Sequence, residues 1–266
     1  MLLTLSTGSL RRRLSSNGRS GMSMFDVPEF VIRQLGLHGL NVQASMLSGW
    51  SLEDLDRFRD CADKAACPCL VLVEDAPLAF ADKSEEVRSK AADRVRRVAV
   101  AANRLGCSAI AIHIDAPDSD DAFDAALAQI KNLMPAVERL ELNVLIAPSN
   151  GLTSTTERLT SIIKRVGGFR IGSLPSFRAA AESGGGDPIE TLRKLAPYAG
   201  AIEASVEAFT RKGEHKTYDL AACVSAVRSV GFVNTLAIDY CGDADPVPTI
   251  EMARDILQKA IDSNGE

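Results

Sequence analysis

The sequence has little histidine, few aromatic residues and no excess of positive charge. It contains three His among 266 residues, 5 % aromatic residues and a formal net charge of -5. Nucleic-acid-binding proteins usually carry a basic excess, so this balance argues against a nucleic-acid partner. No apolar run approaches the roughly 20 residues that a membrane-spanning helix needs, which argues against a membrane protein.

Six cysteines are spread along the chain, and none of them forms a C-x-x-C pair. Most lie in apolar surroundings, which is typical of buried reduced thiols rather than of disulfides or metal ligands. Three arginines, Arg11 to Arg13, mimic a twin-arginine export signal, but the polar segment 15–18 follows them where such a signal has an apolar stretch. The sequence therefore predicts a cytoplasmic protein.

Short apolar runs alternate with longer amphipathic ones from end to end. The expected strands are 2–6, 39–44, 69–75, 109–115, 143–147, 169–174, 201–208 and 235–241. The expected helices are 27–36, 51–66, 84–105, 119–139, 154–166, 187–197, 217–230 and 248–263. Ser51 with Asp54, and Ser154 with Glu157, have the spacing of capping boxes at helix starts. Gly106 follows the apolar stripe of 84–105 as a left-handed stop.

Strands that alternate with helices indicate a parallel sheet, because parallel neighbours need a crossover connection. An even repeat of eight such units in about 260 residues is typical of an α/β protein with a closed (β/α)₈ TIM barrel. The alternative is an open doubly wound sheet, but no G-x-G-x-x-G follows the first strand. We therefore expect a single TIM-barrel domain over 1–266, with 7–26 as a long loop after the first strand.

Catalytic residues of such barrels lie at the C-terminal ends of the strands. Side chains alternate along a strand, so polar residues at every second position mark the inner face. The candidates are Asn41, Gln43, either Glu74 or Asp75, His113, Asp115, Glu203, Ser205, Glu207 and Asp239. Carboxylates and imidazole can bind a divalent cation, and carboxylates can move protons. Each could instead pair with Arg or Lys, or face solvent at the rim.

Two loops on the same side carry further basic residues. Arginines 11–13 and Arg19 fall in the loop after the first strand, where they could hold a phosphate or a carboxylate. His215 and Lys216 fall in the loop after the seventh strand, where a substrate contact is one interpretation. For both loops the alternative is a solvated segment without a ligand.

Four phrases in the second half of the chain resemble one family of barrels. They are NVLIAPSNGLTSTTERL, IGSLPSF, LAPYAGAIEASVEAF and VGFVNTLAIDYCGD. Together they resemble the xylose isomerase-like superfamily, which includes sugar phosphate isomerases and epimerases and the family 2 apurinic endonucleases. The resemblance implies a metal-assisted proton transfer on a sugar.

The resemblance also implies four ligands for a divalent cation. By position they fall on Ala147, Ser176, Glu203 and Asp239, of which only Glu203 and Asp239 carry carboxylates. A methyl group cannot coordinate a cation, so we expect a degenerate metal site. Two carboxylates with water could still hold Mg²⁺ or Mn²⁺ weakly. A lysine and a glutamate common in the family fall on Ser205 and Asn41.

The sequence thus predicts a sugar phosphate isomerase- or epimerase-like protein that acts on a sugar or polyol. Glu203 and Asp239 are the expected base and acid. The expected substrate-binding residues are Asn41, Gln43, His113, Asp115, Ser149, Asn150, Ser176 and Ser205. Because the metal cage is incomplete, activity could be altered or lost. The alternatives are a non-catalytic sugar- or polyol-binding barrel and, on the family name alone, a DNA-repair endonuclease.

Overall fold

The computed structural model describes residues 1–14, 22–183, 185 and 187–263, and Arg19 lies outside them. The strands are Leu2–Ser6 (β1), Leu40–Gln43 (β2), Cys69–Leu78 (β3), Ala109–Ile114 (β4), Asn143–Ala147 (β5), Ile171–Ser173 (β6), Ala201–Val206 (β7) and Thr235–Tyr240 (β8). All pairs are parallel, in the order β6-β5-β4-β3-β2-β1-β8-β7. The prediction of an α/β TIM barrel is confirmed.

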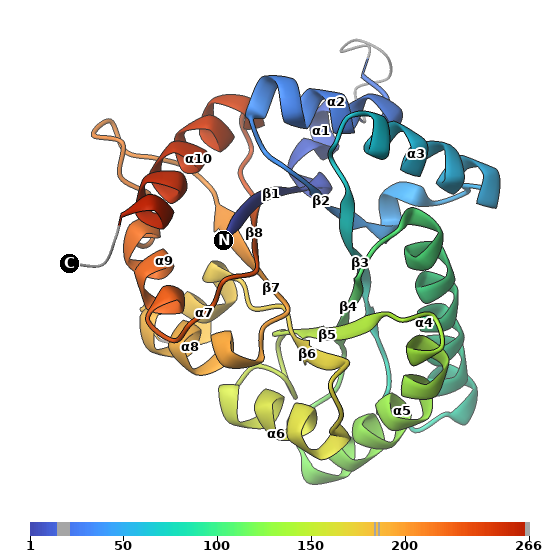
Figure 1. The fold of residues 1–266 in the computed structure, drawn as a ribbon. Helices are drawn as coiled ribbons and strands as arrows, with labels where there is room; N and C mark the ends of the chain where they lie inside the picture. The colour runs from blue at the N-terminus through green and yellow to red at the C-terminus, as the bar shows by residue number, and fades with distance from the viewer. Residues whose placement is uncertain (15–21, 184, 186, 264–266) are drawn as a thin grey trace.

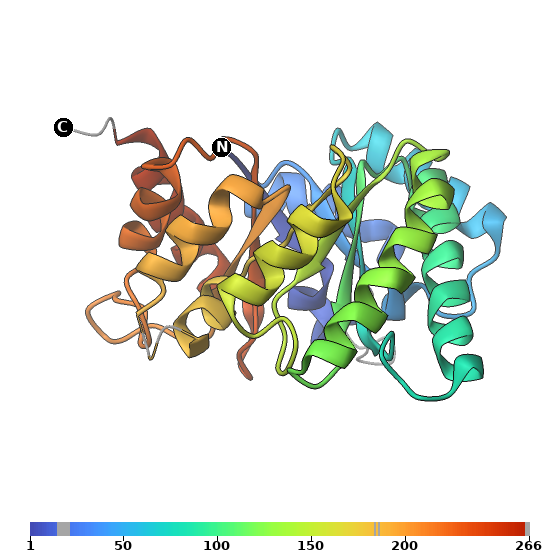
Figure 2. The ribbon, with the colours of Figure 1, turned by 90° about the horizontal axis from the view of Figure 1, so that it is seen from below.

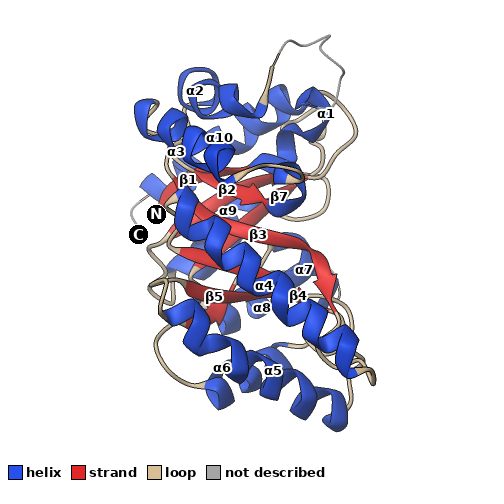
Figure 3. Cartoon of the chain, turned by 90° about the vertical axis from the view of Figure 1, so that its right-hand side faces the viewer, coloured by secondary structure: helices blue, strands red, loops and turns tan. Residues whose placement is uncertain are grey.

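Helices surround the sheet on the outside (Figures 1 and 3). They are Arg11–Leu14 (α1), Val27–Phe30 (α2), Leu52–Lys64 (α3), Glu85–Leu105 (α4), Asp120–Glu138 (α5), Thr156–Val166 (α6), Phe177–Ser183 (α7), Ile189–Leu195 (α8), Leu220–Arg228 (α9) and Pro246–Asp262 (α10). Short helical turns lie at Thr7–Leu10, Met24–Asp26, Val31–Leu35, Ala44–Leu47 and Ala196–Tyr198. None of the helices in the described residues combines the length and hydrophobicity of a membrane span.

The barrel closes between its two outermost strands, β6 and β7. These strands share no continuous ladder but meet at two isolated parallel bridges, Ser173 with Ala199 and Ser176 with Glu203. The Glu203 N–H also donates to the Pro175 carbonyl at 2.9 Å. This seam places Ser176, just past the end of β6, directly beside Glu203.

Strand alternation divides the apolar side chains into two layers. Residues such as Ile110, Ile112 and Ile146 belong to the large core shared with the helices. A smaller cluster, which includes Ala111 and Leu145, contains only strand residues and the segments that adjoin them, so it fills the barrel interior. Residues that pair with this inner cluster across the strands, or lie two positions along the same strand, also face the interior. By this criterion Asn41, His113 and Glu203 all lie on the inner face.

The helix starts follow local capping chemistry, with one correction. The Ser51 box is confirmed, since Ser51 and Asp54 exchange side-chain-to-backbone bonds of 2.9 and 3.2 Å. The Ser154 box is wrong: α6 begins one residue later, and Thr155 accepts from the Arg158 N–H at 3.3 Å. Ser154 Oγ instead donates to a loop carbonyl at 2.7 Å.

Several boundaries differ from the expected ones: β3 continues to Leu78, and β6 is shorter than the expected strand 169–174. Two further segments differ in kind. The segment 7–26 is not irregular throughout, because its described parts form a 3₁₀ turn, α1 and a second turn. Helix α7 is absent from the expected helices. The Ser176 hydroxyl accepts from the Ala179 N–H at 3.1 Å and so caps its first turn.

Candidate active site at the mouth of the barrel

The C-terminal ends of β7 and β8 place two carboxylates on the inner face of the barrel. Glu203 stands opposite Ala237 and Ser205 opposite Asp239 in the parallel register. Glu203 therefore lies one layer deeper than Asp239 on the adjacent strand. Both side chains are partly buried. Their placement on the inner face agrees with the alternation in the sequence.

Burial and the nearby charge of Asp239 both favour the protonated form of Glu203. Burial, reinforced by repulsion from Asp239, raises the pKa of Glu203 from 4.5 to about 8. A carboxyl with this pKa keeps its proton near neutral pH and can donate it to a ligand. Asp239 is the neighbouring carboxyl group that can serve as general base. The pair can thus supply one proton donor and one acceptor to the same ligand.

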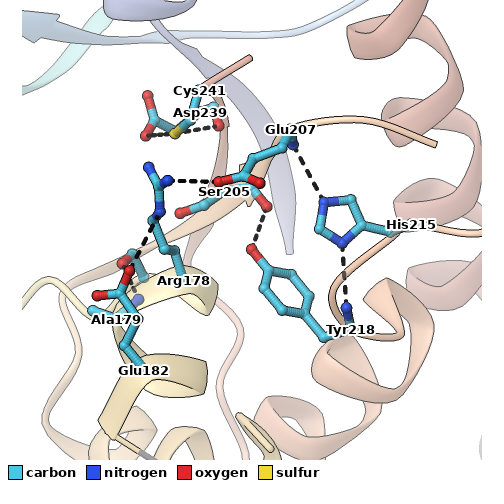
Figure 4. Close-up of polar contacts among 10 residues, drawn as sticks. Arg178, Ala179, Glu182, Ser205, Glu207, His215, Tyr218, Asp239 and Cys241 are labelled. Atoms are coloured by element: carbon cyan, nitrogen blue, oxygen red, sulfur yellow. Dashed lines mark hydrogen bonds and ion pairs between the residues drawn. The ribbon is translucent and has the colours of Figure 1, made fainter. Parts of the chain in front are cut away.

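Cys241 and Arg178 surround the Asp239 side of the pair (Figure 4). The Cys241 thiol donates to Asp239 Oδ2 at 3.3 Å. Burial raises the pKa of this thiol above its usual range, and Asp239 adds to the effect. Arg178, from α7, forms an ion pair with Glu207 at 2.6 Å. A thiol that remains protonated can orient the carboxylate that it contacts.

Two side chains of the largely exposed loop after β7, His215 and Tyr218, are held against the strand (Figure 4). The Tyr218 hydroxyl donates to the Ser205 carbonyl at 2.7 Å, and the Glu207 N–H donates to His215 Nε2 at 3.2 Å. The His215 ring also packs against Tyr218, with 4.5 Å between ring centroids. His215 therefore supports the site from outside, and the expectation of a solvated loop is wrong for it; Lys216 is exposed.

The inner face of β2, one strand beyond β1 from β8, contains a buried amide without a partner. Asn41, on β2, is 0 % exposed, and neither its Oδ1 nor its Nδ2 has a hydrogen-bond partner. Thr4 Oγ1, on the neighbouring inner face of β1, is also buried and unpartnered. Buried amides and hydroxyls are nearly always hydrogen-bonded, so these atoms require a partner, which a bound water or a ligand group would supply.

Gln43 and Asp75 belong to a network around Arg11. Arg11 donates to Gln43 Oε1 at 2.5 Å and contacts Asp75 at 3.4 Å. Asp75 also accepts from the Ser45 N–H at 3.0 Å. The open choice between Glu74 and Asp75 is thereby resolved, because Asp75 faces the mouth whereas the buried Glu74 pairs with Arg94 of α4 at 2.5 Å.

The other two arginines of this segment bind acidic residues of the loop between β8 and α10. Arg12 pairs with Asp243 at 2.5 Å and Arg13 with Asp245 at 2.9 Å. The three arginines therefore connect the segment after β1 to loops on both sides of the mouth. Surface pairs of this kind contribute little stability individually, so their effect is mainly to place the loops.

The remaining expected site residues lie at the rim. His113 faces the interior opposite Ala147, and burial lowers its pKa while Asp75 and Glu74 oppose the shift. Asp115 and Asn150 are exposed in loops beyond β4 and β5. Ser149 Oγ donates to the Ile114 carbonyl at 3.0 Å, which joins the same two loops.

The donor set does not fit a four-ligand cation cage. Ala147 presents a buried methyl group at one of the four positions, and the Ser176 hydroxyl at another is engaged in capping α7. No three His, Cys, Asp or Glu side chains gather as a metal site within the residues that the structure describes. Sequence analysis overlooked Arg178, Tyr218 and Cys241; Arg178 belongs to the helix that was not expected.

A family model described as xylose isomerase-like TIM barrel matches residues 31–260. No curated protein matches the sequence. Among solved structures, the E. coli 3-keto-D-glucoside 4-epimerase has a TM-score of 0.78 at 13 % identity, covering 97 % of this chain and 99 % of its own. An L-ribulose 3-epimerase has a TM-score of 0.79 at 12 % identity, covering 100 % and 99 %. At these identities the structural likeness establishes the fold alone.

A third similar structure is the D-psicose 3-epimerase of Clostridium cellulolyticum H10, solved with D-tagatose. Its TM-score is 0.76 at 12 % identity, and the match covers 98 % of this chain and 97 % of that chain. The three proteins share nearly the whole length of the barrel with this chain.

Proposed function

Since the chain belongs to the xylose isomerase-like TIM barrel family, we propose that it binds a sugar or polyol at the barrel mouth and isomerises or epimerises it by proton transfer. The proposal agrees with the similar structures, whose names describe sugar epimerases. Glu203 and Asp239 are the proposed acid and base.

The observation that carries the proposal is the buried Asn41 amide on the same inner face as the two carboxylates. A buried polar group without a partner costs about 1–3 kcal/mol. A ligand hydroxyl can both donate to Oδ1 and accept from Nδ2, so a polyol satisfies the amide completely. Sugars present such hydroxyls on adjacent carbons, and Asn41 shares the inner face of the barrel with Glu203 and Asp239.

The proposed step moves two protons and does not change the total charge of the site. Asp239 takes a proton from the carbon next to the substrate carbonyl, and the C–H electron pair forms the enediol double bond. Glu203 gives its proton to the carbonyl oxygen at the same time, which avoids a free enolate. For the isomer, Asp239 returns its proton to the neighbouring carbon while Glu203 takes a hydroxyl proton of the enediol, which restores a carbonyl. For the epimer, water gives a proton to the other face of the first carbon, Asp239 protonates the hydroxide that is left, and Glu203 takes back the enol proton. The Cys241 thiol orients Asp239.

A second candidate is a barrel that binds a sugar or polyol without converting it. The buried methyl of Ala147 favours this candidate, since the family resemblance implies a cation ligand at that position. Weak binding of Mg²⁺ or Mn²⁺ by Glu203 and Asp239 remains part of the first candidate only. The two candidates share the ligand class and differ in the chemistry.

A two-stage experiment tests both candidates. A thermal-shift screen of sugars, sugar phosphates and inositols should find a ligand that raises the melting temperature. NMR of each hit incubated with the protein in D₂O should then show exchange of one carbon-bound hydrogen, and Asp239→Asn should abolish the exchange. Binding without exchange would establish the second candidate. Absence of any stabilising polyol would refute both.

Replacing Asn41 should separate stability from binding. Asn41→Leu keeps the side-chain volume and removes an unpartnered amide, so unfolding should cost about 1–2 kcal/mol more. The same variant should lose the thermal shift produced by the ligand. Urea denaturation and the ligand screen measure the two effects.

Asn103→Leu on the exposed face of α4 is the matched control and should change stability by less than about 0.5 kcal/mol. A destabilised Asn41→Leu protein would contradict the interpretation of the amide as a ligand-binding group.

A further inference from the structure

A cavity of about 680 Å³ opens at the end of the barrel opposite the mouth. It lies where several strands begin, near Val71 of β3, Ala109 of β4 and Thr235 of β8. The N-terminus, where β1 begins, marks this end in Figure 2. The side chains that give this basal cavity its chemistry are Asn143, Lys164, Phe169, Arg170, Tyr198 and Asn234. Its volume lies within the range of roughly 300–1,000 Å³ of small-molecule sites.

Small residues form the inner wall of the basal cavity and leave its space open. Ala109 and Gly172 lie at the base of β4 and β6, and Gly200 precedes β7. A Cβ added at Gly200 would stand 2.5 Å from Leu145 Cδ2, so this glycine lets the backbone pass directly over the leucine. Barrels of this kind are usually filled by bulky branched side chains, and here the basal layer leaves space instead.

The lining carries positive charge and no carboxylate. Lys164 and Arg170 both line the cavity, and neither forms an ion pair within the described part of the chain. Arg170 is held by a 2.7 Å bond from Nη1 to the Glu141 carbonyl, which leaves its charge uncompensated. The Lys164 ammonium lies 5.5 Å from the centre of the Tyr198 ring. On a chain with a net charge of -5, this is a locally anion-attracting surface.

An exposed aromatic ring stands at the rim of the basal cavity. Phe169 is 104 % exposed, and it follows Gly167 and Gly168, whose φ angles are +74° and +85°. Burying a phenylalanine side chain is worth about 1.5–3 kcal/mol. A flat apolar group between Phe169 and Tyr198 would gain this energy, while Asn143 and Asn234 offer amides to its polar substituents.

From the cationic lining and the exposed ring, we propose that the basal cavity is a second binding site for a small organic anion with a flat apolar body. Lys164 and Arg170 bind the anionic group, and Phe169 covers the apolar body. A carboxylate and a phosphate monoester share this chemistry. The site is separate from the mouth, so it does not depend on the reaction proposed there.

Titration calorimetry with benzoate and with phenyl phosphate tests the proposal. At least one of them should bind with 1:1 stoichiometry and a Kd below about 1 mM. Which of the two binds more tightly identifies the anionic group. Lys164→Gln and Phe169→Ser should each weaken binding about tenfold, the loss expected for one charge-assisted contact or one buried ring.

Lys131→Gln on α5 makes the same charge change away from the cavity and should leave the affinity unchanged. Benzyl alcohol and inorganic phosphate each lack one half of the ligand and should bind at least about tenfold more weakly. The proposal fails if neither aromatic anion saturates the protein. It also fails if Lys131→Gln weakens binding as much as Lys164→Gln, or if inorganic phosphate binds as tightly as the aromatic anions.

Discussion

At about pH 9, the Glu203→Gln variant should be more stable than the wild-type protein by roughly 5 kcal/mol. Burial and the repulsion from Asp239 raise the pKa of Glu203 from 4.5 to about 8. Ionising this side chain therefore costs more in the folded protein than in the unfolded chain. One pKa unit corresponds to about 1.4 kcal/mol, and glutamine carries no proton to lose.

The gain should depend on pH with a definite sign. Below pH 4.5, Glu203 is protonated in both states, so its contribution to wild-type stability is fully present. As the pH rises toward 8, the unfolded chain releases the proton first, and that stability is progressively lost. Urea denaturation of both proteins at about pH 4 and about pH 9 should show the difference only at the higher pH.

Glu207→Gln is the matched control, because Glu207 follows the same strand but its side chain is 40 % exposed and is paired with Arg178. It should lower stability by less than about 1 kcal/mol near neutral pH. An equal stability difference between wild type and Glu203→Gln at both pH values would mean that the Glu203 carboxyl is not perturbed.

Combining Ala147→Glu with Ser176→Asp should raise the affinity for Mn²⁺ by about 100-fold, taking about tenfold for each added carboxylate. Ala147 faces the interior opposite His113, and Ser176 forms a bridge with Glu203. The Ala147→Glu carboxylate would therefore enter the interior, and the Ser176→Asp carboxylate would lie beside Glu203. One oxygen of the new aspartate can accept from the Ala179 N–H as the Ser176 hydroxyl does, which keeps the first turn of α7, and the other oxygen remains for the cation. Calorimetric titration of chelator-treated protein measures the change.

Ala147→Gln with Ser176→Asn provides the control, since it matches the size of the first pair without adding charge. Its Mn²⁺ affinity should equal that of the wild-type protein. If the acidic double variant also binds like wild type, the assignment of Ala147 and Ser176 to the missing ligand positions is incorrect.

Strand alternation in the sequence alone predicts that most of the mouth residues face the barrel interior. Asn41, Glu203, Ser205 and Asp239 all lie on the inner face, as the register shows. Alternation succeeds because consecutive side chains must leave opposite faces of a strand. The functional roles of these residues remain predictions, because the register shows which way each side chain points but not what it does.

Two features of the structure could not be predicted from local sequence patterns. Glu74 and Asp75 are adjacent and both acidic, and only the ion pair from Arg94 on α4 distinguishes them. Helix α7 spans seven residues, too few for a periodic apolar stripe. Its Arg178 reaches Glu207 across 29 positions of sequence, a contact that tertiary packing alone creates.

The seam between β6 and β7 has a consequence for motion. β6 is three residues long, and isolated bridges replace a continuous ladder beside it. Local opening begins where few cooperative hydrogen bonds must break, and the Glu203 N–H belongs to this joint. The lowest-energy opening of the barrel wall therefore passes through the backbone of the proposed acid. A ligand that bridges Glu203 of β7 and His113 of β4 would hold the two sides of the seam together as it binds, so occupancy of the mouth and rigidity of the barrel should rise together.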